Sequence, residues 1–104
     1  MIRIYLSGKM SGLPDNNYPA FNAEAARLRA MGYWVENPAE NPAPPCGTWA
    51  GYMRTAVRQM LVCDQVASLP GWKRSRGALI EHWIATAFGM PSVPCEEITR
   101  NDPQ

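Results

Sequence analysis

Short apolar runs alternate with longer segments of helical periodicity along the chain. The short runs have the length of strands and cover residues 2–6, 33–35, 65–69 and 91–95. Between them, apolar side chains recur at spacings of three and four residues over residues 19–31, 49–62 and 75–88. These periods predict four strands separated by three helices.

This alternation predicts a parallel sheet with helices on both faces. We expect one domain over residues 1–104 with an α/β fold, a flavodoxin- or Rossmann-like three-layer sandwich of four or five parallel strands. In such sheets, ligands bind beyond the carboxyl ends of the strands. The loops that follow the first three strands are rich in Gly, Pro, Asn and Ser, and cover residues 7–18, 37–48 and 70–75.

The middle helix has the clearest amphipathic pattern. Thr48 can cap it, and its apolar stripe consists of Trp49, Tyr52, Met53, Ala56, Val57, Met60 and Leu61. This stripe is wide enough to serve both the sheet and a second copy of the chain. Because a four- or five-stranded sheet in 104 residues has a small core, we expect a homodimer or a higher homo-oligomer.

Charge and composition narrow the classes of partner. The net charge is only +1 and its charged residues are spread along the chain, so we expect no extended nucleic acid as a partner. The apolar runs are too short for a transmembrane helix. The N-terminal MIRIYLSG has a strand pattern and no cleavable signal, so a cytoplasmic protein is expected.

The cysteines argue against a metal site. Cys46, Cys63 and Cys95 lie far apart, and His82 is the only histidine. We therefore expect three unpaired thiols in a reducing compartment, with neither a zinc site nor a disulfide framework.

A Ser-x-Gly turn precedes the third helix. Ser75 and Gly77 fall at its N-terminus, where free backbone N–H groups and the helix dipole favour an anion. Lys73, Arg74 and Arg76 add positive charge. The alternative is that Ser75 only caps the helix and the basic side chains are solvated.

Glu81 lies in the second turn of this helix. At about 100° per residue it borders an apolar stripe formed by Ile80, Trp83, Ile84, Ala87 and Phe88. A carboxylate there is costly to desolvate unless it has partners, and such positions are enriched in functional residues. The alternative is a glutamate at the rim that reaches water.

Other side chains have weaker signals. Tyr5, at the end of the first strand, could place its hydroxyl near the strand ends or be a core aromatic residue. We interpret the four tryptophans, Trp34, Trp49, Trp72 and Trp83, as mostly core or pocket wall, and Trp72 is the one that could stack on a nucleobase. His82 is expected at the surface. Asp64 begins the third strand and is interpreted as structural.

The segments YLSG, CDQVASLPGW and SRGALIEHWIATAFGMP, together with GKMSGLPDNNYPAF and the turn that begins at Asn37-Pro38, resemble the nucleoside 2-deoxyribosyltransferase-like superfamily. The resemblance covers nearly the whole chain. The nearer match is the small, uncharacterised and often phage-borne branch of the DUF4406 type.

The resemblance implies a mechanism. In characterised relatives a glutamate attacks C1′ of the sugar and displaces the base, which leaves a glycosyl-enzyme that water or another base resolves. The matching residue is Glu81, and Tyr5 matches a tyrosine that positions it. No cofactor and no metal is implied.

Ser75 further favours a nucleotide over a nucleoside. Nucleoside transferases of the superfamily have an aspartate there, whereas the deoxynucleoside 5′-monophosphate N-glycosidases have a serine, which can donate to a phosphate. By the same analogy Ser7, Gly8 and Lys9 line the pocket, and Asn37, Trp72 and Gly77 complete the expected substrate-binding set.

One position departs from the enzymes. They carry an aspartate that helps to protonate the leaving base, eight residues before the aspartate of the third strand; here this residue is Ala56. Asp15 and Glu40 are the candidates to replace it. The alternatives are a nucleotide-binding protein without turnover, acting as a sensor or sequestering protein, and a structural protein that kept only the fold.

Overall fold

The computed structural model describes residues 1–99. Its strands form one parallel sheet in the order β2-β1-β3-β4, with β1 at Arg3–Ser7, β2 at Trp34–Glu36, β3 at Gln65–Ser68 and β4 at Ser92–Pro94. The helices are α1 at Tyr18–Ala30, α2 at Trp49–Leu61 and α3 at Arg76–Ala87. The predicted α/β fold class is confirmed, and each predicted boundary lies within a residue of the observed one.

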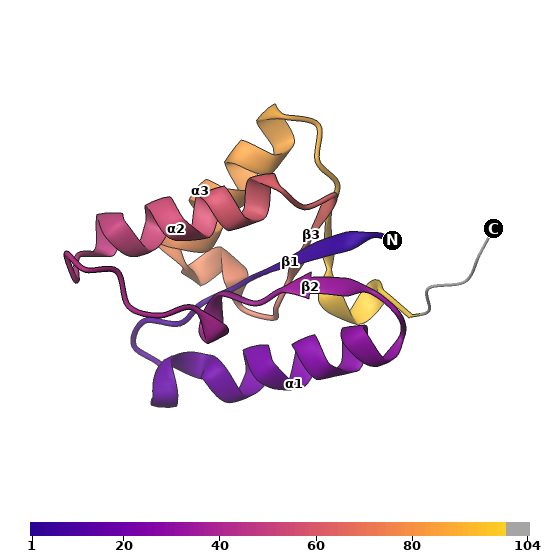
Figure 1. Ribbon diagram of the computed structural model, residues 1–104, viewed down its shortest axis with the longest axis horizontal. Helices are drawn as coiled ribbons and strands as arrows, with labels where there is room; N and C mark the ends of the chain where they lie inside the picture. Colours follow the sequence, from indigo (N-terminus) through magenta and orange to yellow (C-terminus); the bar gives the residue numbers. More distant parts are fainter. Residues whose placement is uncertain (100–104) are drawn as a thin grey trace.

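The sheet separates two helical layers (Figure 1). Ile4 and Leu6 of β1 point to the face covered by α1, where they pack with Phe21 and Leu28. Tyr5, between them, points to the opposite face, which α2 and α3 cover. This alternation is the two-residue period of a strand buried on both sides, and it places Tyr5 and Ser7 beneath the same two helices.

The ends of the sheet have different roles. At the amino end, the backbone N–H of Arg3 donates to the Asp64 carboxylate at 2.7 Å, and the Asp64 N–H donates to the Arg3 carbonyl at 2.8 Å. Asp64 therefore ties β1 to the entry of β3, in agreement with its structural interpretation. At the carboxyl end, Ser7 pairs with Ser68, so the loops that follow β1 and β3 leave the sheet side by side.

Two predicted caps hold the helices that matter for the site. The Thr48 hydroxyl accepts a hydrogen bond from the Gly51 N–H at 3.0 Å at the start of α2. At the start of α3, the Ser75 hydroxyl accepts from the Ala78 N–H at 3.1 Å. Each cap satisfies a backbone donor that the first turn of a helix leaves unpaired.

Only part of the predicted apolar stripe of α3 faces the sheet: Ile84 packs against the core on that side, whereas Trp83 and Phe88 do not. The buried face of α3 consists of Ala78, Glu81 and Ala85, while Trp83 and Phe88 have exposed fractions of 71% and 72%. The interpretation of Trp83 as core or pocket wall is therefore wrong. Small side chains allow α3 to lie close to the sheet, and the larger apolar residues are left on its outer side.

Other aromatic residues also differ from expectation. Trp34 lies on the edge strand β2 and is about half exposed, so it is not core. His82 is not a free surface residue: its Nδ1 lies 3.0 Å from the Ser92 hydroxyl, and its ring packs against Trp72 with centroids 4.6 Å apart. Among residues 1–99, no helix combines the length and apolarity needed to cross a bilayer.

Candidate functional site

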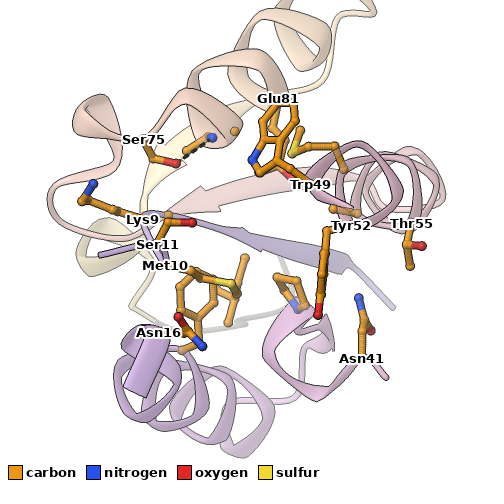
Figure 2. A pocket seen from close by; sticks show the side chains of 18 of the residues that line it. Lys9, Met10, Ser11, Asn16, Asn41, Trp49, Tyr52, Thr55, Ser75 and Glu81 are labelled. Carbon is orange, nitrogen blue, oxygen red and sulfur yellow. Dashed lines mark hydrogen bonds between the residues drawn. The ribbon is translucent and has the colours of Figure 1, made fainter. Parts of the chain in front are cut away.

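A cavity of about 550 Å³ opens beyond the carboxyl ends of the strands. Its walls come from the loops after β1 and β2, from α2, and from the first turns of α3 (Figure 2). Residues from all three predicted ligand loops line it, including Lys9, Asn41 and Ser75. The cavity therefore lies where the topology of a parallel sheet places a ligand.

Glu81 is a buried carboxylate in the wall of this cavity. Only 5% of the residue is exposed. The Tyr5 hydroxyl donates to its Oε2 at 2.6 Å, and the Ser7 hydroxyl donates to its Oε1 at 2.7 Å. Both oxygens are thus fixed by strand β1, and each keeps lone pairs that Tyr5 and Ser7 do not occupy.

The electrostatics of this group are those of a desolvated carboxyl. Burial raises the pKa of Glu81, while the hydrogen bonds from Tyr5 and Ser7 act in the opposite direction because they favour the charged form. Burial, followed by the charge of Glu81, holds the pKa of Tyr5 well above its usual value of 10.0. Tyr5 is therefore a permanent donor, and the carboxylate that it holds is poorly hydrated.

Positive charge collects at one end of the cavity. Lys9, Arg74 and Arg76 all line it near the N-terminus of α3. The Lys9 Nζ donates to the Arg74 carbonyl at 3.5 Å, and the Arg76 guanidinium lies 4.2 Å from the ring centroid of Trp49. Because Ser75 uses an oxygen lone pair in its cap, its O–H donor is still available to a ligand.

The two predicted glycines have packing roles. A Cβ on Gly8 would lie 3.0 Å from the Leu69 Cβ and 3.3 Å from the Phe21 ring, so the first loop needs glycine to lie against the sheet. A Cβ on Gly77 would lie 3.0 Å from the Met53 sulfur. Gly77 lines the cavity, and its missing side chain also lets α2 approach α3.

Three residues of the predicted binding set, Trp72, Asn37 and Ser7, lie outside the cavity lining. Trp72 packs against His82 instead. Asn37 is buried, with its carbonyl accepting from the Ala39 N–H at 3.1 Å and its amide donating to Asn22 at 3.0 Å. Both are placed to support the loops. Ser7 reaches the site through Glu81 and is not itself a lining residue.

Among residues 1–99, Glu81 is the one carboxylate that lines the cavity. Ala56 lines it from α2, as the resemblance implies, whereas Asp15 and Glu40 do not line it. Glu40 is held outward by Arg29, whose Nη1 lies 2.7 Å from Oε2. Neither carboxylate is therefore placed to compensate for Ala56.

Sequence reasoning missed the end of the cavity opposite the basic residues. Asn41, Tyr52 and Thr55 lie there, and Pro38 and Pro42, close to Asn41 in the chain, also line the cavity. Tyr52 was assigned to an apolar stripe, and Asn41 lies in a proline-rich loop with no motif. The position of this loop in the chain could have indicated it. The loop follows the second strand, so its side chains lie at the same end of the sheet as those of the first loop.

The three thiols differ in their environments. Cys63 and Cys95 are buried, and burial raises the pKa of each to about 12. Cys46 is exposed in the loop before α2, and its sulfur lies 3.1 Å from the Thr48 hydroxyl. This hydrogen bond lowers the pKa of Cys46.

Comparison with protein-family models matches residues 2–93 to DUF4406, a domain of unknown function. The chain belongs to the DUF4406 family. No curated protein matches it. The DUF4406 match spans β1 to β3 and all of the residues that line the cavity, which run from Tyr5 to Glu81. Within residues 1–99 of this DUF4406 protein, no three His, Cys, Asp or Glu side chains gather as metal ligands.

Proposed function

We propose that this DUF4406 protein cleaves or transfers the N-glycosidic bond of a 2′-deoxynucleoside 5′-monophosphate, with Glu81 as the nucleophile. The observation that carries the proposal is the buried Glu81 carboxylate, held through both oxygens by Tyr5 and Ser7 in the wall of a cavity with a basic end. A structural glutamate would need no such cavity beside it. The resemblance to the deoxyribosyltransferase-like superfamily supports the same assignment.

The proposed chemistry uses the desolvated carboxylate directly. One oxygen of Glu81 bonds to C1′ as the C1′–N bond breaks, and the electron pair of that bond leaves with the base. The base takes a proton from water, and a water molecule or a second base then displaces Glu81 from C1′. A carboxylate suits this role because it stabilises an oxocarbenium-like centre and is also a good leaving group.

The basic end of the cavity supports a phosphorylated substrate. A 5′-phosphate at the N-terminus of α3 would meet free backbone N–H groups, the Ser75 hydroxyl and the charges of Lys9, Arg74 and Arg76. A nucleoside would leave these donors without a charged partner. We therefore propose the monophosphate in preference to the nucleoside.

A second candidate function is nucleotide binding without turnover. It is favoured by Ala56, because Glu81 is the single carboxylate among the cavity-lining residues of the described chain. Positioned acids commonly contribute about 10²–10⁴-fold to a rate, so a site without one could hold an intact nucleotide. Such a protein would serve as a sensor or would sequester the nucleotide.

One product assay separates these functions. The protein is incubated with each common deoxynucleoside 5′-monophosphate and, separately, with each nucleoside, and free base is measured by chromatography. Glu81→Gln, which keeps the shape of the side chain, is the matched control. A second base is added in parallel to detect transfer.

The proposal expects base release from monophosphates by the wild type and a loss of at least about 10³-fold in Glu81→Gln. Release that persists in Glu81→Gln would disprove the nucleophile. Binding of an intact monophosphate without release would establish the second function. If no nucleotide raises the melting temperature, both nucleotide functions fail and the structural alternative is favoured.

A further inference from the structure

The cavity has two chemically different ends. Lys9 and Ser75 lie on one side of the view in Figure 2, Asn41 and Thr55 lie on the opposite side, and Glu81 lies between them. If the proposed phosphate occupies the basic end and C1′ meets Glu81, the base extends toward Asn41. Tyr52 lies at this end, and Pro38 and Pro42, close to Asn41 in the chain, also line the cavity; these side chains offer apolar surface for a planar ring.

Asn41 is a polar group at this end whose side chain is held at both amide atoms. Its Nδ2 donates to Gln59 Oε1 at 2.8 Å, and its Oδ1 accepts from Gln59 Nε2 at 3.1 Å. The Asn41 backbone N–H also donates to the Pro38 carbonyl at 3.2 Å. Each polar atom of the Asn41 amide keeps one further valence, a single N–H on the nitrogen and a lone pair on the oxygen.

The orientation of this amide pair is decided by Glu36. Gln59 Nε2 donates to Glu36 Oε1 at 3.0 Å, and Trp34 Nε1 donates to Glu36 Oε2 at 2.7 Å. A carboxylate accepts hydrogen bonds and cannot donate them, so the nitrogen of Gln59 must face Glu36. Rotating the Asn41 amide by 180° would then place donor against donor and acceptor against acceptor at Gln59.

We propose that Asn41 selects the nucleobase, and that Glu36 fixes its amide through Gln59. The amide of an unrestrained asparagine can rotate by 180°, so it can pair with either an amino group or a carbonyl group on a base. The fixed amide keeps its free N–H and its free lone pair at set places, so the site discriminates bases with an amino group at the position that meets Asn41 from bases with a carbonyl group there. This inference rests on the proposed nucleotide pocket.

The test measures dissociation constants by calorimetry in the Glu81→Gln background, which prevents turnover. The probes are dAMP against dIMP and dCMP against dUMP, because each pair exchanges one amino group of the base for a carbonyl group and changes no other substituent. We expect a preference of at least about fivefold within the pair that binds, since a mismatched buried polar group is costly.

Three variants locate the source of that preference. Asn41→Ala should bring the ratio close to one, and Asn41→Asp, which presents only acceptors, should move it toward the amino-bearing base. Glu36→Gln should bring the ratio of dissociation constants closer to one, because the side-chain amide of Gln59 can then rotate by 180°. Glu40→Gln is the matched control, because it removes a nearby carboxylate that is paired with Arg29 instead.

The outcomes separate this inference from the function beneath it. If no nucleotide binds, the nucleotide pocket and the role of Asn41 both fail. If nucleotides bind without discrimination, or if the preference survives Asn41→Ala in a protein with unchanged melting temperature, only the role of Asn41 fails. If Glu40→Gln reduces the ratio of dissociation constants as much as Glu36→Gln does, the proposal that Glu36 fixes the Asn41 amide is rejected.

Discussion

At the scale of the residue, Glu81 sits in a place where a charge opposes folding. Its carboxyl is buried against strand β1, and its polar partners are the hydroxyls of Tyr5 and Ser7. Two neutral donors compensate only part of the hydration that the carboxylate loses. Functional groups are often held in this way, at a cost that the rest of the fold compensates.

We predict that Glu81→Gln stabilises the protein at neutral and higher pH. A carboxyl with a raised pKa in the folded state contributes stability below its unfolded value of 4.5, and that contribution is lost as the pH rises through the folded value. The melting temperature of Glu81→Gln should therefore exceed that of the wild type by a few degrees near about pH 8, with little difference near about pH 4.

Glu40→Gln gives a control of opposite sign. The hydrogen bond from Arg29 lowers the pKa of Glu40, so its contribution is present above the unfolded value and is lost as the pH falls. Thermal melts of both variants across the pH range make the comparison. A Glu81→Gln shift that is the same at every pH would contradict the assignment to the buried charge.

Tyr5→Phe tests how the nucleophile is held. Removing the hydroxyl removes a hydrogen bond that favours the charged form, so the pKa of Glu81 rises further. The acid limb of the kcat/KM profile should move to higher pH, and the rate near neutrality should fall by roughly tenfold. Tyr33→Phe, on the α1 side of the sheet, should leave the profile unchanged. An acid limb that stays in place would show that Tyr5 only fills space.

At the scale of the element, helix α2 places a small side chain, that of Ala56, in the wall of the cavity. Ala56 lines the cavity from the same helix as Trp49 and Tyr52. An acid at this position would be carried on a rigid helix and aimed at the space beside Glu81. Rigid placement is what a proton donor needs in order to act in the transition state.

We therefore predict that Ala56→Asp accelerates base release, by up to about 10²-fold if protonation of the base limits the rate. Ala56→Asn is the matched control, since it has nearly the same shape and transfers no proton at neutral pH. Single-turnover release of base from a monophosphate is the measurement. Equal rates for the two variants would show that protonation of the leaving base does not limit the rate.

The helices also show where sequence periodicity succeeds and fails. The ends of α2 and α3 could be predicted because Thr48 and Ser75 cap them through local hydrogen bonds. The inward face of α3 could not, because periodicity favours the larger apolar side chains and the sheet instead accepts Ala78, Glu81 and Ala85. The periodicity places Glu81 at the edge of the apolar stripe of α3, yet the residue lies at the centre of the buried face of this helix.

At the scale of the whole molecule, the order of strands could be narrowed from the sequence and the cavity contents could not. Alternating strands and helices allow few parallel arrangements, so the layers follow from connectivity. The hydrogen bonds of Gln59 with Asn41 and with Glu36 join residues 18 and 23 positions apart. Such contacts depend on how a loop settles on a helix, which no local pattern encodes.

The outer side of α3 leads to a prediction about assembly. Trp83 and Phe88 are largely exposed, and exposed apolar surface of this kind commonly marks an interface. We predict a homodimer or higher homo-oligomer that the double substitution Trp83→Lys and Phe88→Lys converts to a monomer. Light scattering measures the mass, with Leu13→Lys in the first loop as the control. A wild type that is already monomeric would reject the prediction.

The three thiols differ in exposure and pKa, so a fluorescent label can be attached to one of them selectively. Cys46 is exposed with a lowered pKa, whereas Cys63 and Cys95 are buried with pKa values of about 12. A maleimide dye near neutral pH should therefore attach at a single position. That position lies between Pro44 and Trp49, which both line the cavity. One fluorophore in the native sequence can thus report occupancy of the pocket in real time, with no engineered cysteine.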